Sequence, residues 1–189
     1  MNTQSFTESR DTPRTPTPNT AKRCSSPNGA APRERRAEEP RDAQPTDPFA
    51  ARYGRHLPLG LRTEAAHMSW SDFTDAYSPK TGPVCLKGWS ERRVDAAHKT
   101  YSATLQVDGT TRTTRASGAG AISAMTAIVY EAGYPVEINS FHQQHAGKQT
   151  ATFLECARGY QRHWAMGIGA DSSESIVNAF VAAANLLSN

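Results

Sequence analysis

The chain has 189 residues, of which 37% are hydrophobic and 21% are charged, and its formal net charge is +3. These values suit one modest globular domain with an unstructured extension, and no apolar run reaches the length that would cross a membrane. The three cysteines, Cys24, Cys85 and Cys156, are widely spaced and form no C-x-x-C pair, so neither a disulfide framework nor a zinc site is predicted.

Residues 1–47 are rich in Thr, Pro, Ser, Arg and Glu and contain one aromatic residue, Phe6. Because this composition buries too little apolar surface to offset the entropy of ordering, we predict a disordered tail. Its basic cluster, Arg33, Arg35 and Arg36, is interleaved with glutamates, which favours a solvated tail over a nucleic-acid-binding one. The start of the chain lacks the apolar core of a secretory signal, so a cytoplasmic location is expected.

Residues 48–94 are predicted to form a linker-like subdomain, because aromatic residues and leucines return there. Short helices are expected from about Leu59 to Met68 and from Ser69 or Ser71 to Tyr77, before Ser-Pro and Gly-Pro pairs that stop them. The segment is too short for a core of its own, so we expect it to dock on the C-terminal part.

Residues 95–189 show the patterns of an α+β domain, beginning with a hairpin. Apolar and polar residues alternate in the stretch from Lys99 to Ser117, around an Asp108-Gly109 pair that favours a two-residue turn. A helix is expected after Gly118-Ala119-Gly120, and Gly133 is typical of its C-terminal end.

Three further strands and a second helix are predicted after Pro135. The strands span 136–142, 149–157 and 162–169, and the helix is marked by Asp171 as N-cap with Glu174 as its capping-box partner. The predicted order is therefore β-β-α-β-β-β-α, with both helices packed on antiparallel sheet.

Three segments between about Tyr101 and Asn185 carry specific motifs in a fixed order. They are VDGTTRTTRASGAGAISAMTAIVYEAG, a hairpin followed by a Gly-rich helix start, then ATFLEC, a strand that reaches a glutamate, and WAMGIGADSSESIVNAFVAAAN. Together they resemble the C-terminal regulatory, leucine-binding domain of 2-isopropylmalate synthase, with its G-x-G-P-[IL] and W-G-V-G-I motifs. The resemblance implies related strand-and-helix units, a homodimer, and leucine held near the dimer interface.

The catalytic part of that family resembles a (β/α)₈ barrel, a fold of about 250 residues. In the family it binds a divalent metal through an aspartate and an H-x-H pair, and this chain contains no H-x-H. We therefore expect no catalytic residue, no metal site and no cofactor, and no enzyme activity from this chain alone.

A candidate site for an amino acid lies at the start of the helix after Gly118 and Gly120. Free backbone N–H groups at a helix start suit a carboxylate, and glycines let a ligand approach closely. Apolar residues that could line the pocket are Ile122, Ile138, Phe141 and Ile168. The resemblance adds Ser140, which stands where the family often has an aspartate, so leucine binding could be weakened or the ligand changed. The alternative is that both glycines serve a tight turn and the isoleucines are core.

Other patterns favour structural interpretations. His142 and His145 would point to opposite faces of a strand, which favours a polar surface segment over a metal site. Cys156 shares the parity of Leu154 and is predicted to be a buried thiol. The Gly167-Ile168-Gly169 run lacks the third glycine of a phosphate-binding turn and is interpreted as a structural corner.

Three hypotheses for function follow. The first is a non-catalytic dimeric module that binds leucine or a related small molecule and regulates branched-chain amino-acid biosynthesis. The second is a subunit of a split acyltransferase of the 2-isopropylmalate or homocitrate type, joined by a separate barrel-type synthase chain. The third is an interaction protein that keeps the fold and has lost ligand binding. None of them involves a membrane or nucleic acid.

Overall fold

Two three-stranded antiparallel sheets and the helices packed on them make up the part of the chain that the computed structural model describes, residues 47–96 and 98–188. The predicted disordered tail lies outside these residues, apart from Asp47. The elements are α1 (Pro48–Tyr53), α2 (Leu59–Glu64), α3 (Trp70–Tyr77), β1 (Val84–Arg93), β2 (Lys99–Val107), β3 (Thr110–Gly118), α4 (Ala121–Glu131), β4 (Glu137–Ala146), β5 (Gln149–Arg158), β6 (Gln161–Gly169) and α5 (Ser172–Leu186).

The same order of elements, three strands and then a helix, occurs twice. The first unit pairs its strands in the order β1-β2-β3 and ends in α4, and the second pairs β4-β5-β6 and ends in α5. The predicted α+β class is confirmed, with one strand more than the predicted order. That strand, β1, lies within the segment 48–94 that the sequence assigned to the linker, so this segment supplies part of the first sheet.

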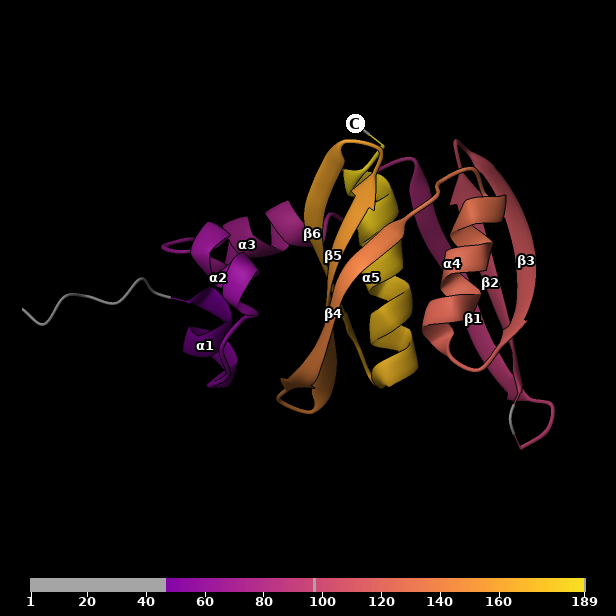
Figure 1. Cartoon of the computed structure of the whole chain (residues 1–189), viewed down its shortest axis with the longest axis horizontal. Coiled ribbons are helices and arrows are strands. Elements are labelled where there is room, and N and C mark those ends of the chain that lie inside the picture. The colour runs from indigo at the N-terminus through magenta and orange to yellow at the C-terminus, as the bar shows by residue number, and fades with distance from the viewer. Residues whose placement is uncertain (1–46, 97, 189) are drawn as a thin grey trace, which may run out of the picture. The chain divides into compact units, whose positions relative to one another are not determined.

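The helices and the two sheets are stacked in layers. In Figure 1, α5 lies between the two sheets, in contact with β5 and β6 on one side and with β1 on the other. Helix α4 packs against β2, β3 and α5, while α3 packs on β6 from the opposite face of the second sheet. The second sheet is thus covered on both faces.

The two faces of the second sheet belong to two separate cores. On one face, Leu154 and Cys156 join a cluster with Phe180 of α5 and with residues of α4 and the first sheet. On the other face, Phe153 and Met166 join a cluster made with α1, α2 and α3. Because successive residues of a strand point to opposite faces, the run ATFLECA carries apolar residues on both of its faces.

Helix α5 fits closely against β6. Asp171 caps it by accepting a hydrogen bond from the N–H of Glu174 at 2.8 Å, and the Glu174 carboxylate accepts one from the Ala170 N–H at 2.6 Å. The predicted Asp171 cap is confirmed, while Glu174 reaches back to the N–H of the residue before the cap rather than to that of Asp171 itself. A Cβ added at Gly167 or at Gly169 would overlap the backbone of α5, so both glycines are needed for this packing.

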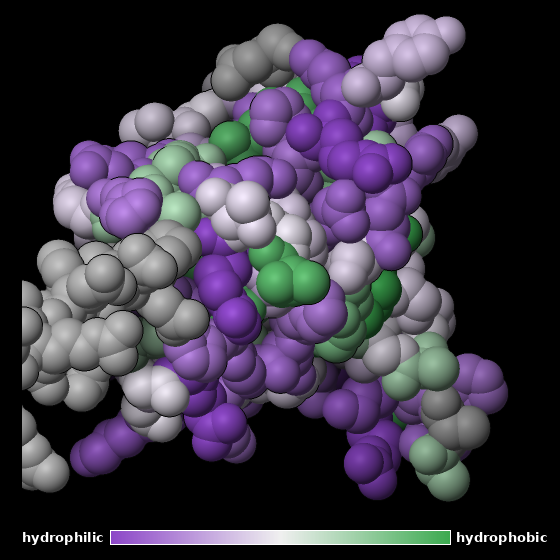
Figure 2. Space-filling view, turned by 60° about the vertical axis from the view of Figure 1, so that its left-hand side comes forward, coloured by the Kyte–Doolittle hydropathy of each residue, from purple (hydrophilic) through white to green (hydrophobic). Residues whose placement is uncertain are grey.

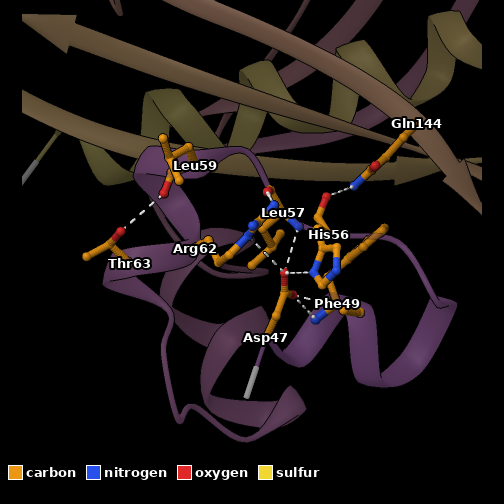
Figure 3. Close-up of polar contacts among 9 residues, drawn as sticks. Asp47, Phe49, His56, Leu57, Leu59, Arg62, Thr63 and Gln144 are labelled. Atoms are coloured by element: carbon orange, nitrogen blue, oxygen red, sulfur yellow. Dashed lines mark hydrogen bonds and ion pairs between the residues drawn. The ribbon is translucent and has the colours of Figure 1, made fainter. Parts of the chain in front are cut away.

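The N-terminal helices are organised around Asp47, which is buried. Figure 3 shows its carboxylate capping α1 and accepting hydrogen bonds from the N–H groups of Phe49 at 3.0 Å and Leu57 at 2.8 Å. Arg62 and His56 also approach this carboxylate, at 3.5 and 3.4 Å. One side chain therefore joins the start of α1, the segment before α2, and α2 itself.

The surface is mainly polar where Figure 2 shows it, with hydrophobic residues in small separate patches. Among the described residues, the large hydrophobic side chains with the most exposure are Leu59, Val94, Tyr130, Phe141 and Tyr160. Of these, Phe141 belongs to the site predicted from the sequence.

Candidate functional site

The start of α4 presents free backbone donors. Gly120 is the N-cap residue, and no side chain caps the helix there. Among the described residues, nothing accepts a hydrogen bond from the N–H groups of Ile122 and Ser123. The first turn of α4 therefore has unpaired N–H donors of the kind that can hold a carboxylate.

The two glycines before α4 differ in what they do for the fold. A Cβ added at Gly118 would lie 2.5 Å from the Ser123 hydroxyl, so the absence of a side chain serves close packing there. Gly120 is extended, with φ −159°, and a Cβ added to it would meet nothing within 4 Å. Neither backbone conformation nor packing within the described chain requires a glycine at position 120, which leaves open space beside the free N–H groups.

Of the five remaining predicted site residues, Ile122 lies on α4, and the other four lie on the second sheet, divided between its two faces. Ile122 and Ile138 are half-buried and pack on the core cluster that α4 and α5 share. Phe141 pairs with Leu154 and thus faces the same way as Ile138, although the residue is 39% exposed.

The other two lie on the opposite face. Ile168 packs on the cluster under α1, α2 and α3, and Ser140 pairs with Glu155, so both face these N-terminal helices. The Ser140 hydroxyl lies 3.0 Å from His142 Nε2. Within one chain, the seven predicted residues therefore do not line a single cavity.

Ile168 instead lines the cavity of about 750 Å³ between α3, β1, β6 and α5. Met166 and Val181 contribute apolar walls, and Lys80 and Lys87 contribute positive charge. Asn185 also lines the cavity and links α5 to β1. Its amide oxygen accepts a hydrogen bond from the Val84 N–H, and its amide nitrogen donates one to the Val84 carbonyl, both at 2.9 Å. This cavity touches the N-terminal helices and both repeated units.

The thiol of Cys156 is buried, as predicted. Burial raises its pKa from an ordinary 9.0 to about 12, because the charged thiolate is disfavoured away from water. The thiol lies 3.1 Å from the carbonyl of His163 and donates to it. A protonated, enclosed thiol of this kind is a packing residue rather than a nucleophile.

Within residues 47–96 and 98–188, no group of three or more His, Cys, Asp or Glu residues could hold a metal ion. His142 pairs with Phe153 and His145 with Thr150, so the two side chains point to opposite faces of β4, as predicted, and both are exposed. The centroid of the His142 ring lies 6.2 Å from that of the Trp164 ring. Among the described helices, none is long and apolar enough to span a membrane.

These features define an α+β module of two repeated units whose candidate site offers backbone N–H groups and half-buried isoleucines. No protein-family model matches the chain. Its sequence is 29% identical over 127 residues to a 2-isopropylmalate synthase from Arthrobacter sp. (strain FB24), a match that covers 61% of this chain and 22% of that protein. A second such enzyme, from Parafrankia sp. (strain EAN1pec), is 28% identical over 124 residues, with the same coverage.

A third 2-isopropylmalate synthase, from Renibacterium salmoninarum, is 25% identical over 134 residues, which are 64% of this chain and 23% of the enzyme. The resemblance inferred from the sequence motifs is thereby confirmed. The chain spans little more than a fifth of the length of these relatives, and the matched segment is too short to contain a barrel of about 250 residues.

Proposed function

We propose that this chain is a non-catalytic regulatory module, related to the leucine feedback domain of 2-isopropylmalate synthase, that forms a homodimer and binds leucine or a related small molecule. The observation that carries the proposal is the match to about 22% of the synthases over 61% of this chain. Such a module would act on branched-chain amino-acid biosynthesis in the cytoplasm.

The start of α4 is the proposed place for the effector's carboxylate. The free N–H groups of Ile122 and Ser123 would donate to it, and the positive end of the α4 dipole would favour its charge. The side chains of Ile122 and Ile138, half-buried on one cluster, would contact an apolar part of the effector. The exposed Phe141 would complete the site from a second copy of the chain, whereas Ser140 and Ile168 face the N-terminal helices and lie outside the site proposed here.

The test is calorimetric titration of the full chain with leucine, valine, isoleucine and their 2-oxo acids, with the dimer checked by light scattering. The decisive variant is Gly120→Ser. A serine at this N-cap would accept hydrogen bonds from the same N–H groups that the effector needs, and it would stabilise α4 by a few tenths of a kcal/mol. We expect unchanged or higher stability together with at least tenfold weaker binding.

The matched control is Ala127→Ser, which adds the same hydroxyl at an exposed position of α4 and should leave binding unchanged. If the Gly120→Ser variant binds the effector as tightly as the parent chain, the start of α4 is not the binding site. A folded dimer that gives no heat with any of the ligands would refute the sensor function.

A second candidate is a regulatory subunit of a split acyltransferase, favoured by the small share of the synthases that this chain covers. Leu59, 77% exposed on α2, is then a contact for the barrel chain. Co-purification of a barrel-type synthase with the tagged chain, lost on Leu59→Glu, would support this candidate. A dimer that binds neither an amino acid nor a barrel-type synthase would support the third hypothesis, an interaction protein that has lost ligand binding.

A further inference from the structure

The cavity of about 750 Å³ between α3, β1, β6 and α5 shares no residue with the site proposed at the start of α4. Its volume lies in the upper part of the range for small-molecule pockets, so it suits a ligand considerably larger than an amino acid. Sixteen residues line it, and none of these sixteen is acidic. The two that carry charge are Lys80 and Lys87. A cleft lined by one sign of charge attracts ligands of the opposite sign, so this cavity favours an anion.

A β-bulge brings Lys87 to this cavity. The register of β1 on β2 shifts between Leu86 and Gly88, which leaves Lys87 as the extra residue of the strand. In a regular strand Leu86 and Lys87 would point to opposite faces, yet both line the cavity. Bulges bend a strand and re-aim a side chain, and they are frequent next to active sites. Lys80 comes from another segment, the loop between α3 and β1, so two separate segments supply the positive charge.

The walls of the cavity mix apolar side chains with uncharged polar ones. The apolar ones include Met166, Ile168 and Val181, and the polar ones include Thr74, Ser78, Gln149 and Asn178. The Asn178 amide is held in place, because its nitrogen donates a hydrogen bond to the Ile168 carbonyl at 2.8 Å. An alkyl chain would displace water from the amides and hydroxyls and give them no partner, which costs free energy. A heterocyclic base and a ribose carry donors and acceptors for these groups and still cover the apolar walls.

We propose that this cavity binds a nucleoside phosphate. The base and ribose lie between the apolar walls and the amides of Gln149 and Asn178, and the phosphates lie at Lys80 and Lys87. Lysine binds phosphate as a point charge, and two lysines suit a diphosphate better than a single carboxylate. Because α3, β1, β6 and α5 all line the cavity, the bound nucleotide contacts the N-terminal helices and both repeated units. Nucleotide binding goes beyond the proposed function and does not depend on it.

The test is calorimetric titration of the full chain with ADP, GDP and UDP, and with three partial probes: adenosine, pyrophosphate and octyl phosphate. At least one nucleotide should bind, and each partial probe should bind about tenfold more weakly or worse. Lys80→Met and Lys87→Met should each weaken nucleotide binding about fivefold, and Val181→Phe, which fills the apolar part, about tenfold or more. Both lysines are exposed, so their variants should fold, as circular dichroism would verify.

The control variant is Arg115→Met, which removes one exposed positive charge from β3, a strand that contributes no residue to the cavity. It should bind nucleotide as the parent does. Equal weakening by Arg115→Met and Lys87→Met would overturn the site, because the nucleotide would then respond only to the net charge of the chain. Pyrophosphate or octyl phosphate binding as tightly as the nucleotides would overturn the nucleoside class.

The nucleotide and leucine titrations have separate outcomes. Absence of binding by all three nucleotides would overturn this inference and leave the site at the start of α4 as it stands. Nucleotide binding that is weakened by Lys80→Met and Lys87→Met, in a chain that gives no heat with leucine, would support this cavity and refute the sensor function.

Discussion

The close packing of α5 on β6 predicts that Gly167→Ala is strongly destabilising. The backbone at Gly167 does not need positive φ, so the effect would come from packing alone. The added methyl would overlap backbone atoms of Ser175 and Ala179, and a helix backbone cannot rotate away as a side chain can. The whole of α5 would have to shift within the core that Phe180 fills.

Overpacking of a well-filled core typically costs about 1–3 kcal/mol, and we expect the upper end because the obstructing atoms are backbone, so about 3 kcal/mol. Urea unfolding followed by tryptophan fluorescence would measure the difference. The control is Gly88→Ala in β1, where the added Cβ would lie at an ordinary 3.8 Å from Thr104. That variant should stay within about 0.5 kcal/mol of the parent, or be more stable. If the Gly167→Ala chain is as stable as the Gly88→Ala chain, α5 does not pack against Gly167 too closely to admit a methyl group.

Three other changes test separate contacts. Asp47→Ala should lower the free energy of unfolding by about 2–3 kcal/mol, because it removes the α1 cap and leaves the buried Leu57 N–H unpaired; Asp47→Asn, which keeps the acceptor oxygen, should cost less. Asn185→Ala should cost about 3 kcal/mol in a urea titration, because both backbone groups of the buried Val84 lose their partner, and a loss below 1 kcal/mol would contradict this. Because the pKa of Cys156 is raised, the folded state keeps a proton that the unfolded chain loses above about pH 9. This thiol therefore lowers the free energy of unfolding as pH rises from about 9 toward 12, by at most about 1.4 kcal/mol per pH unit. In guanidinium titrations between about pH 8 and 10.5, Cys156→Ala should reduce the dependence of stability on pH.

Local signals predicted the elements that depend on neighbours in sequence. The Asp108-Gly109 turn, the Asp171 cap and the alternation in β2 each act within a few residues, and the structure confirms all three. Strand β1 was missed because only Val84 is buried among its ten residues, so the apolar alternation that marks a strand is weak. This segment is a strand because its backbone pairs with β2.

The candidate site was less predictable, because strand parity alone does not say which face meets which helix. The second sheet is buried on both sides, so Ile138 and Ile168 both look like pocket residues although they belong to different cores. The cavity that Ile168 lines is formed by residues of α3, β1, β6 and α5, and no local pattern specifies how these elements meet.

The two repeated units differ in how their sheets are covered, and this difference follows from their composition. The outer face of the second sheet carries Phe153, Met166 and Ile168, and the apolar residues of α1, α2 and α3 pack on it. The corresponding face of the first sheet carries serines, threonines and arginines, among them the paired hydroxyls of Thr104 and Thr113, 2.9 Å apart. A polar face gains nothing from a covering helix, so the N-terminal helices dock on the second sheet alone. Because the same segment continues into β1 of the first sheet, it connects the two units along the chain.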